Sequence, residues 1–348
     1  MRKVTVNASK KYDILIGRGL LEQSGKLIKQ AAGGSCVAVV TDSNVAPLYM
    51  QTLKAGLEAA GCRVVTHVFE AGEANKNIHT FAEILNFLAA NRLDRTDVIA
   101  ALGGGVTGDM AGFAASVYLR GIRFVQLPTT VLAAVDSSVG GKTAIDLPAG
   151  KNLAGAFYQP ELVICDTDTL NTLPEREYGS GFAEIIKYAV IAEPKLLDMI
   201  KTPERDIDEI IETCVKIKRD IVEADEFEAG QRQLLNFGHT IGHAVEKASG
   251  FKLLHGEAVA VGMIAKAAVR KGICTKECLD DIVSACKKEK LPVSADYSCK
   301  ELMDMICSDK KVRGNTINVI LPEHTGKCEI SNITIEEMSS LLDMALQE

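Results

Sequence analysis

Residues 98–109, VIAALGGGVTGD, predict the fold of the first half of this chain. Residues 98–102 form a continuous apolar run, which indicates a strand buried on both faces of a sheet. The glycines that follow lead directly into the helical pattern of residues 106–118. A strand, a glycine-rich turn and a helix in this order are typical of nucleotide-binding α/β domains, because glycine lets the backbone approach a pyrophosphate at a helix N-terminus.

The nucleotide signal is partial when it is taken by itself. No acidic residue follows about 20 positions later, where the usual dinucleotide fingerprint binds a ribose. Residues 42–44, Asp-Ser-Asn, end an earlier apolar run and could supply that function instead. The alternatives are a tight turn for the glycines and a helix cap for Asp42, and spacing alone leaves them open.

Short apolar runs and helical patterns alternate through residues 1–172. We expect strands at 37–40, 63–69, 98–102, 124–127 and 162–165, and helices at 45–60, 78–91 and 106–118. This order predicts a Rossmann-like α/β domain with a mainly parallel sheet. From residue 173 onward the patterns are mostly helical, at 182–191, 207–222, 234–248 and 257–270. We therefore expect residues 173–348 to form a mostly α-helical domain.

Composition excludes several classes of function. With 348 residues and 47% hydrophobic content, the chain can bury a core in each of two domains. The formal net charge of −7 argues against broad binding to nucleic acid or to anionic membranes. The first residues lack the apolar stretch of a signal peptide, and no segment has about 18 uninterrupted apolar residues, so we expect a cytoplasmic protein. The ten cysteines are expected to be reduced and mostly buried.

Residues 129–152, TTVLAAVDSSVGGKTAIDLPAGKN, form a polar segment rich in small residues. Its charged and amide side chains of interest are Asp136, Lys142, Lys151 and Asn152. Lysines in glycine-rich loops often hold phosphate as point charges. A solvated surface loop is the alternative, and Arg120 has the same two interpretations.

Glu184 and Lys187 lie three residues apart in a mostly apolar helical pattern, so they share one face of the expected helix. An exposed pair of this kind contributes a few tenths of a kcal/mol, roughly. The apolar surroundings also allow a buried, functional charge. Spacing leaves both interpretations open.

Residues 235–246, LNFGHTIGHAVE, and the following His255 place three of the six histidines of the chain within seventeen residues. Imidazoles gathered at one pocket commonly bind a transition metal or move protons, whereas three packed histidines are the alternative. The i, i+4 spacing by itself favours His239 and His243 as a metal pair. Thr240 stands where a metalloprotease has its catalytic glutamate, so the motif is not a metalloprotease signature.

Six segments, in order, resemble the 3-dehydroquinate synthase family: GGGVTGDMAGFAASVYLRG, LPTTVLAAVDSSVGGKTAID, GKNLAGAFYQP, GFAEIIKY, LLNFGHTIGHAVE and LHGEAVAVGM. The resemblance extends to Asp309-Lys310-Lys311 and so covers nearly the whole chain. It implies an α/β domain that binds NAD, a helical domain that binds metal and substrate, and an active site in the cleft between them. The implied reaction, from the shikimate pathway, converts 3-deoxy-D-arabino-heptulosonate 7-phosphate to 3-dehydroquinate and phosphate. Its implied course is NAD-dependent oxidation, phosphate elimination, re-reduction and aldol closure.

Members of this family are typically homodimers that need NAD and one divalent metal, usually zinc, with cobalt as an active substitute. The resemblance assigns the metal to Glu184, His239 and His255, which replaces the pair suggested by spacing. It makes His243 a residue for substrate binding or proton transfer. Arg120 would reach the phosphate of the substrate bound to the neighbouring subunit.

The family pattern also implies the remaining roles. The catalytic residues would be Lys142, Glu184, Lys187, Glu228 as a proton acceptor, and His243. The NAD contacts would be Asp42, Asn44, Ala71, Gly72, Glu73, Ala74, Asn75, Lys76, Gly105, Val106, Thr107, Gly108, Asp109, Thr129, Thr130, Lys142, Lys151, Thr169, Leu170, Asn171 and Thr172. The substrate contacts would be Arg120, Asp136, Lys142, Asn152, Lys187, Lys218, Arg232, Asn236, His243 and either Lys310 or Lys311.

Three other functions fit parts of this pattern. Another sugar-phosphate cyclase would share the cofactor and metal but use a substrate without a carboxylate, against which Lys218, Arg232 and Asn236 argue. A metal-dependent polyol dehydrogenase would release stoichiometric NADH. A nucleotide-binding regulatory protein would lack catalysis, which the intact set of metal ligands and lysines disfavours.

Overall fold

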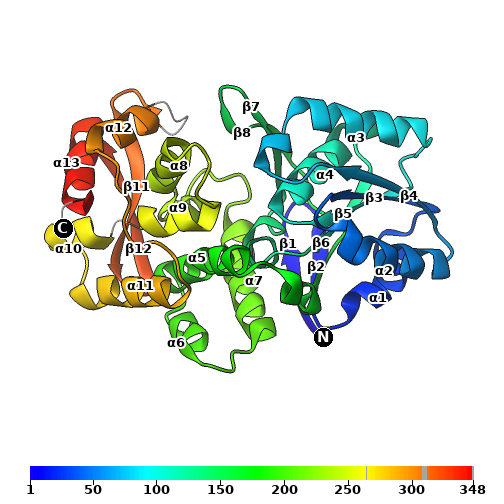
Figure 1. Ribbon diagram of the computed structural model, residues 1–348, viewed down its shortest axis with the longest axis horizontal. Helices are drawn as coiled ribbons and strands as arrows, with labels where there is room; N and C mark the ends of the chain where they lie inside the picture. The colour runs from blue at the N-terminus through cyan, green and yellow to red at the C-terminus, as the bar shows by residue number, and fades with distance from the viewer. Residues whose placement is uncertain (264, 308–311, 347–348) are drawn as a thin grey trace. The chain divides into compact units, whose positions relative to one another are not determined.

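The computed structural model describes residues 1–263, 265–307 and 312–346. The chain divides into two compact units, one formed by Met1–Leu173 with Lys218–Glu226 and the other by Pro174–Ile217 with Phe227–Glu348 (Figure 1). The sequence predicts a single boundary after residue 172. In the structure the chain also returns to the first unit at Lys218. None of the helices among the described residues is long and apolar enough to cross a membrane.

The first unit is built on a seven-stranded sheet with the order β1-β2-β9-β6-β5-β3-β4. The strands are β1 (Arg2–Asn7), β2 (Lys11–Gly17), β3 (Cys36–Asp42), β4 (Arg63–Phe69), β5 (Val98–Gly103), β6 (Arg123–Pro128) and β9 (Leu162–Asp166). Only the β1–β2 pair in this sheet is antiparallel. The expected mainly parallel sheet and its five expected strands are therefore confirmed.

Helices cover both faces of this sheet. They are α1 (Leu20–Ala32) and α2 (Ala46–Ala59) on one face, and α3 (Ile78–Ala90) and α4 (Gly105–Val117) on the other. Within β3, Val37 and Val39 pack toward the first pair of helices, whereas Ala38 and Val40 pack toward the second. This two-sided burial explains the continuous apolar runs, since consecutive strand residues point to opposite faces.

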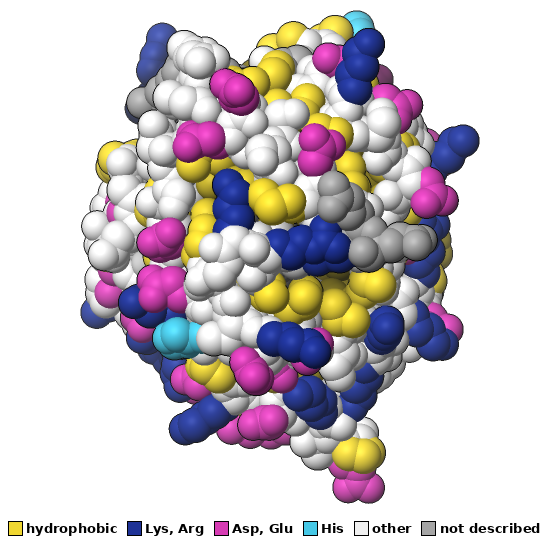
Figure 2. All heavy atoms as spheres, turned by 90° about the vertical axis from the view of Figure 1, so that its left-hand side faces the viewer, with side chains coloured by type: hydrophobic (Ala, Val, Ile, Leu, Met, Phe, Trp, Pro, Cys, Tyr) yellow, Lys and Arg dark blue, Asp and Glu magenta, His cyan; other side chains and the backbone are white. Residues whose placement is uncertain are grey.

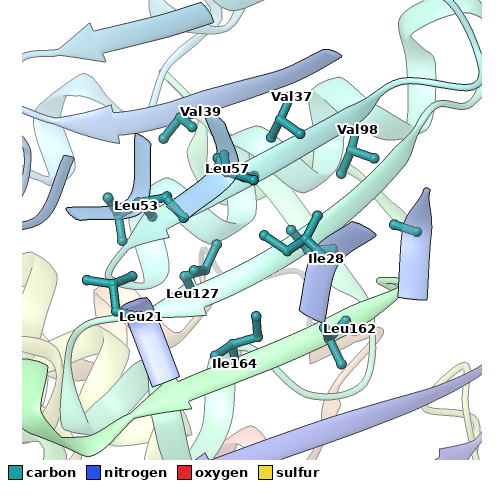
Figure 3. Close-up of a cluster of buried hydrophobic side chains, with 14 of the residues drawn as sticks. Leu21, Ile28, Val37, Val39, Leu53, Leu57, Val98, Leu127, Leu162 and Ile164 are labelled. Carbon is teal, nitrogen blue, oxygen red and sulfur yellow. The ribbon is translucent and has the colours of Figure 1, made fainter. Parts of the chain in front are cut away.

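Figure 3 shows the core on the side of α1 and α2. Ile28 of α1 and Leu57 of α2 lie over strand residues such as Val37 and Val98, and all four side chains are fully buried. Each large aliphatic side chain buried in this way contributes about 1.5–3 kcal/mol. The rigid sheet that results carries the loops at its carboxyl edge.

Shorter elements complete the first unit. They are the helical turns η1 (Glu73–Asn75), η2 (Tyr118–Arg120), η3 (Ala133–Ser137) and η4 (Thr167–Thr172), and the hairpin β7 (Lys142–Leu147) and β8 (Gly150–Phe157). The strands β1, β2, β7 and β8 are additional to those expected from the sequence. β1 alternates polar and apolar residues, as a half-exposed antiparallel strand does, and so has a weaker signal than a continuous apolar run.

The second unit is largely helical, as expected. Its helices are α5 (Glu175–Ile191), α6 (Lys195–Lys201), α7 (Ile207–Ala224, which continues into the first unit), η5 (Gln231–Asn236), α8 (His239–Ala248), α9 (His255–Gly262), α10 (Ala265–Arg270), α11 (Lys276–Lys288), α12 (Cys299–Cys307) and α13 (Ile335–Leu346). An antiparallel sheet of β10 (Val312–Arg313), β11 (Thr316–His324) and β12 (Lys327–Thr334) accompanies them. Residues of β11 pack with α8, α12 and α13 in one core.

Two expected helices of the second unit are interrupted. The helix expected at 234–248 begins only at His239, because η5 ends at Asn236 and Gly238, with a φ of 79°, lies outside helical geometry. The helix expected at 257–270 divides into α9 and α10, with Met263 outside helical geometry at a ψ of 82°. Both interruptions involve glycines whose positions are set by tertiary contacts, which helical periodicity does not report.

All ten cysteines are free, and Cys307 is the one with an exposed side chain. Burial raises the pKa of Cys274 and of Cys286 to about 12, so these thiols stay protonated. On the face shown in Figure 2, acidic and basic side chains are interspersed rather than gathered into one continuous basic surface. This agrees with the net charge of −7.

Candidate active site

α5 carries two charged residues into the core of the second unit. All residues from Gly179 to Ile191 are buried, and the side chains of Glu184 and Lys187 are each 1% exposed. The Lys187 ammonium contacts the Glu184 carboxylate. Buried charges persist only when they are paired or bind a metal. The exposed ion pair considered from spacing is therefore excluded, and both charges need a role in the interior.

Close backbone packing brings α8 and α9 to this part of α5. A Cβ atom on Gly256 would lie 1.8 Å from the carbonyl oxygen of Ser180, and one on Gly262 would lie 2.0 Å from that of Gly238. The Ser180 hydroxyl also accepts a hydrogen bond from the Gly256 amide at 3.2 Å. Glycine is thus required at both contacts. The result is that the first residues of α8 and α9, His239 and His255, both reach Glu184.

Glu184, His239 and His255 form one compact group. The Oε1 atom of Glu184 lies 3.3 Å from Nε2 of His239 and 3.5 Å from Nε2 of His255. One ligand atom from each residue lies within 4.8 Å of the others. Within the described part of the chain, neither buried oxygen of Glu184 has a partner with hydrogen-bond geometry. A carboxylate and two imidazoles converging on one point fit a zinc-type ion and leave further coordination positions for a substrate.

The electrostatics of the group suit a cation. Burial would raise the pKa of Glu184, but Lys187 and His239 hold that pKa well below its usual value. Burial lowers the pKa of His239, so its ring is neutral. For His255, burial is outweighed by Glu184 and Glu246, which raise its pKa to about 9. A divalent cation would therefore compete with a proton at His255.

His243 lies one helical turn after His239 on α8. Its ring centroid is 5.5 Å from that of His239 and 5.8 Å from that of His255. It belongs to a second group with Glu246 and His255, rather than to the group that contains Glu184. The structure therefore places His243 beside the Glu184 group, where its ring could donate or accept a proton.

The other predicted residues of the second unit lie in and around η5. Arg232 is fully buried, and the side-chain amide of Asn236 donates to Oε1 of Glu228 at 2.8 Å. Glu228 has a φ of 62°, an uncommon backbone conformation for a residue other than glycine. Lys310 and Lys311 lie outside the described residues.

The predicted nucleotide residues of the first unit gather at the carboxyl ends of the neighbouring strands β3, β5 and β6. Asp42 ends β3, and its carboxylate accepts hydrogen bonds from the Asn44 amide at 2.9 Å and the Thr107 hydroxyl at 3.2 Å. The Thr129 amide donates to Gly103 at 3.0 Å, while the buried Thr129 hydroxyl has no hydrogen-bond partner among the described residues. This edge is where open α/β sheets bind nucleotides.

Lys76 connects several predicted residues of the first unit. Its side chain is 5% exposed, and its ammonium donates to Asp109 and to the Asn152 side chain, each at 2.6 Å. The Asp146 amide donates to the Lys76 carbonyl at 2.8 Å, and the Asn152 amide donates to the Asp146 carboxylate at 2.8 Å. Lys151 pairs with Glu73 at 3.1 Å. The tip of the β7–β8 hairpin is thereby tied to η1 and α4.

The remaining first-unit residues differ in their surroundings. Lys218 donates to the Asp136 carbonyl at 2.8 Å and pairs with its carboxylate at 2.9 Å, which joins two predicted substrate contacts. Lys142 and Arg120 are exposed. In η4, Thr169 and Leu170 are buried while Asn171 and Thr172 are exposed, and the side chain of Tyr49 holds this turn through the Thr169 carbonyl at 2.9 Å.

Two site features escaped the sequence reasoning. Glu246 lies on α8 seven residues after His239 and three after His243, a spacing that could have placed it on the histidine face. Arg176 makes two hydrogen bonds of 2.7 Å to Glu257, which also accepts the Leu254 amide and so fixes the start of α9. No local pattern indicated this second contact.

Known proteins resemble this chain over nearly its whole length. The sequence profile described as 3-dehydroquinate synthase N-terminal matches residues 66–180, and that described as 3-dehydroquinate synthase C-terminal matches residues 181–312. The chain belongs to the 3-dehydroquinate synthase family. The 3-dehydroquinate synthase of Streptococcus mutans is 42% identical over 353 residues, covering 98% of this chain and 99% of its own.

Solved structures of related cyclases share the fold of this synthase-family chain. A 2-deoxy-scyllo-inosose synthase complexed with carbaglucose-6-phosphate, NAD+ and Co2+ is 25% identical, with a TM-score of 0.87 and coverage of 98% of this chain and 99% of its own. The 2-epi-5-epi-valiolone synthase of Streptomyces hygroscopicus, with NAD+ and Zn2+ bound, is 26% identical, with a TM-score of 0.86 and 99% coverage of both chains. The α/β unit and the helical unit are thus those of sugar-phosphate cyclases.

Proposed function

We propose that this chain is a 3-dehydroquinate synthase, a carbon–oxygen lyase that depends on NAD and a divalent metal. It would convert 3-deoxy-D-arabino-heptulosonate 7-phosphate to 3-dehydroquinate and phosphate. The observation that carries the proposal is the buried Glu184, His239 and His255 group, in a chain 42% identical over nearly its full length to a protein of that name.

Glu184, His239 and His255 would hold the metal, for which zinc is the first choice and cobalt the second. A divalent metal there supplies a Lewis acid that lowers the pKa of a hydroxyl group. Lys187 keeps the Glu184 carboxylate ionised, because its ammonium contacts that carboxylate inside the core. This residue therefore acts on the metal site through charge, and it also offers a donor to the substrate.

NAD would lie along the carboxyl edge of the sheet in the first unit, where it supplies the hydride acceptor and the hydride donor. Asp42 at the end of β3 would face a ribose, and the amides that follow Gly104 at the start of α4 would face the pyrophosphate. Lys76 would hold Asp109 and the β7–β8 hairpin in place around the dinucleotide. The other contacts are those implied by the family pattern.

The substrate carries a carboxylate and a phosphate, and the proposed contacts match these charges. Lys218 and Arg232 would bind the carboxylate, while Lys142, Asn152, Asn236, His243 and one of Lys310 and Lys311 would bind the phosphate. His243 and Glu228 would transfer protons. The imidazole of His243 and the carboxylate of Glu228 are groups that can do so near neutral pH.

We also propose a homodimer in which Arg120 completes the partner's site. Leu119 and Arg120 have φ values of 52° and 65°, followed by Gly121 at 126°, so the turn holds an uncommon conformation that presents Arg120 outward. Exposed apolar side chains lie near this turn. Val117, at the end of α4, is 43% exposed, and Leu153 and Phe157, on the neighbouring strand β8, are each 42% exposed. Such residues suit burial against a second copy of the chain.

One assay tests the reaction. Purified protein is incubated with the heptulosonate phosphate, zinc and a catalytic amount of NAD, and both phosphate and 3-dehydroquinate are followed. We expect equal amounts of the two products and no net NADH. Stoichiometric NADH would indicate the polyol dehydrogenase instead, and turnover only of a sugar phosphate without a carboxylate would indicate another cyclase. Formation of neither product would refute the proposal.

A further inference from the structure

We propose that Glu246 is a positioning residue of the metal centre: its carboxylate holds Nδ1 of His255, so that Nε2 of that ring points to Glu184. This inference rests on the proposed role of His255 as a metal ligand. It assigns a function to a buried carboxylate that the proposed reaction does not otherwise use.

The two nitrogens of His255 face two different carboxylates. Nε2 lies 3.5 Å from Oε1 of Glu184, and Nδ1 lies 3.7 Å from Oε2 of Glu246. The second separation is an ion-pair distance, and a shift of about 1 Å shortens it to a hydrogen bond. The ring therefore lies between a carboxylate of α5 and a carboxylate of α8, and its Nδ1 faces Glu246.

His239 provides an internal comparison. Its Nδ1 lies 3.0 Å from the carbonyl oxygen of Phe237, and its Nε2 faces Glu184 at 3.3 Å. Histidines that bind metals generally donate the other ring N–H to a carbonyl or carboxylate, which sets the tautomer and the ring orientation. His239 obtains this partner from the carbonyl of Phe237, two residues earlier in the sequence. His255 begins α9 and obtains its partner from another helix.

The geometry of α8 explains how one helix can serve both ligands. Glu246 follows His239 by seven residues, close to two turns, so both side chains leave the same face. Glu246 is 4% exposed, and burial of a carboxylate is unfavourable unless it is matched by a polar partner. His255 faces this carboxylate at 3.7 Å, so that Glu246 can restrain rotation of the ligand ring.

The decisive measurement is metal affinity, determined by competition of zinc or cobalt with a chelator. The variants are Glu246→Gln and Glu246→Ala, compared with the wild type. We expect Glu246→Ala to weaken metal binding by about 10–100-fold. Glu246→Gln should lose less, because its amide oxygen still accepts the Nδ1 hydrogen of His255. The Gln variant also keeps the test informative if the Ala variant fails to fold.

Glu289→Gln is the matched control, because Glu289 is a buried carboxylate of the same unit that pairs with Arg205 at 2.6 Å instead of with a histidine. It should bind metal as tightly as the wild type. A role for Glu246 in packing alone would lower the stability of the metal-free protein but leave the metal affinity of the folded protein unchanged. The visible spectrum of the cobalt form should keep the same ligand number in the Glu246 variants and lose a ligand in His255→Ala.

The outcomes distinguish failure of the metal centre from failure of the positioning role of Glu246. If the wild type binds no stoichiometric metal, the proposed metal centre itself is wrong. If the wild type binds metal and Glu246→Ala binds it equally well, the positioning role is wrong while the centre stands. The His243, Glu246 and His255 group also has the spacing of a cation site. Two metals per wild-type chain, reduced to one in Glu246→Ala, would make Glu246 a ligand and overturn its positioning role.

Discussion

At the scale of residues, the buried carboxylate of Glu184 is the common partner of Lys187, His239 and His255. Glu184 is kept ionised inside α5 by Lys187 and by the imidazoles that face it. The removal of one partner from a buried charged group usually costs more than the pair contributes, because the remaining charge stays desolvated. The geometry of the group therefore fits the proposed cation site.

The proposed role of His255 as a metal ligand leads to a prediction at this scale. His255→Ala should abolish metal-dependent turnover and greatly weaken zinc binding, because it removes a ligand, whereas the fold should persist. The check is a turnover assay at measured metal occupancy, together with thermal unfolding of the metal-free protein. His324→Ala is the control, because His324 is an exposed histidine of the same unit at the end of β11. Full activity of His255→Ala at normal metal occupancy would falsify the assignment.

At the scale of elements, one buried lysine helps to hold the β7–β8 hairpin in place. Lys76 is the common partner of Asp109 and Asn152, so it joins the hairpin to α4. Burial would lower the pKa of Lys76, but Asp109 and Glu73 raise it above its usual value, so the ammonium remains charged. The predicted site residues Lys151 and Asn152 belong to β8, so their positions depend on the conformation of this hairpin.

We expect Lys76→Met to release the hairpin. The change leaves Asp109 and Asn152 without their shared donor, and it should lower the free energy of unfolding by roughly 3 kcal/mol. Amide hydrogen exchange in β8 should accelerate, and the KM for substrate should rise. Lys54→Met is the control, because Lys54 pairs at 3.8 Å with Glu58 on the surface of α2, where ion pairs contribute little. Unchanged exchange in β8 would contradict the proposed role of Lys76.

The start of α9 depends on the contact between Arg176 and Glu257. Burial would raise the pKa of Glu257, but Arg176 and the Leu254 amide lower it below its usual value of 4.5. A carboxylate whose folded pKa is lowered adds stability above its unfolded pKa and loses that stability as the pH falls through the folded value. The contribution should therefore be complete near neutral pH and should disappear in acid.

Glu257→Gln tests this pH dependence. In metal-free protein the variant should be less stable than the wild type by a few tenths to about 1 kcal/mol near neutral pH. The difference should shrink as the pH falls below 4.5, the usual pKa of the group. Urea unfolding of both proteins across this range gives the measurement. Glu323→Gln, at a surface pair with Lys327, serves as the control. A difference that stays constant into acid would argue against the ionic contribution.

At the scale of the whole molecule, the chain passes from the first compact unit to the second and then returns briefly to the first. α7 leaves the second unit at Ile217 and enters the first at Lys218, which pairs there with Asp136. Two predicted substrate contacts that are far apart in sequence are thereby joined in one unit. The proposed second subunit adds Arg120 to a site built in this way.

Mixing two inactive variants tests the shared site. Arg120→Ala and Lys142→Ala should each lose most of their turnover, since each removes a proposed cationic contact to the substrate phosphate. In mixed dimers, one site would combine an intact Lys142 with an intact Arg120 from the other chain, so partial activity should return. The measurement needs differently tagged chains and purified mixed dimers. No recovery in confirmed mixed dimers would count against a site shared between subunits.

The periodicity of the sequence determined much of the fold. The strands of the parallel sheet are continuous apolar runs because both faces are covered, and this pattern is local and readable. The β11–β12 hairpin was not expected. No residue of β12 is fully buried, so the strand has no strong apolar period, and it pairs with β11. The interruptions at Gly238 and Met263 were missed for a related reason, since both depend on contacts between helices.

The sequence by itself determined the classes of residue at the candidate site: a glycine-rich turn after a buried strand, three clustered histidines and a charged pair in an apolar helix. Spacing left open which of them meet, and the family resemblance grouped Glu184 with His239 and His255. Only the tertiary structure shows the contacts that bring these three side chains together. Glu184 faces His239 and His255 because Gly256 and Gly262 let α5, α8 and α9 approach at backbone distance. Such contacts join residues far apart in the chain, whereas periodicity records only which face of each element is apolar. For that reason the sequence could indicate a metal site, while the partner of each imidazole nitrogen had to come from the fold.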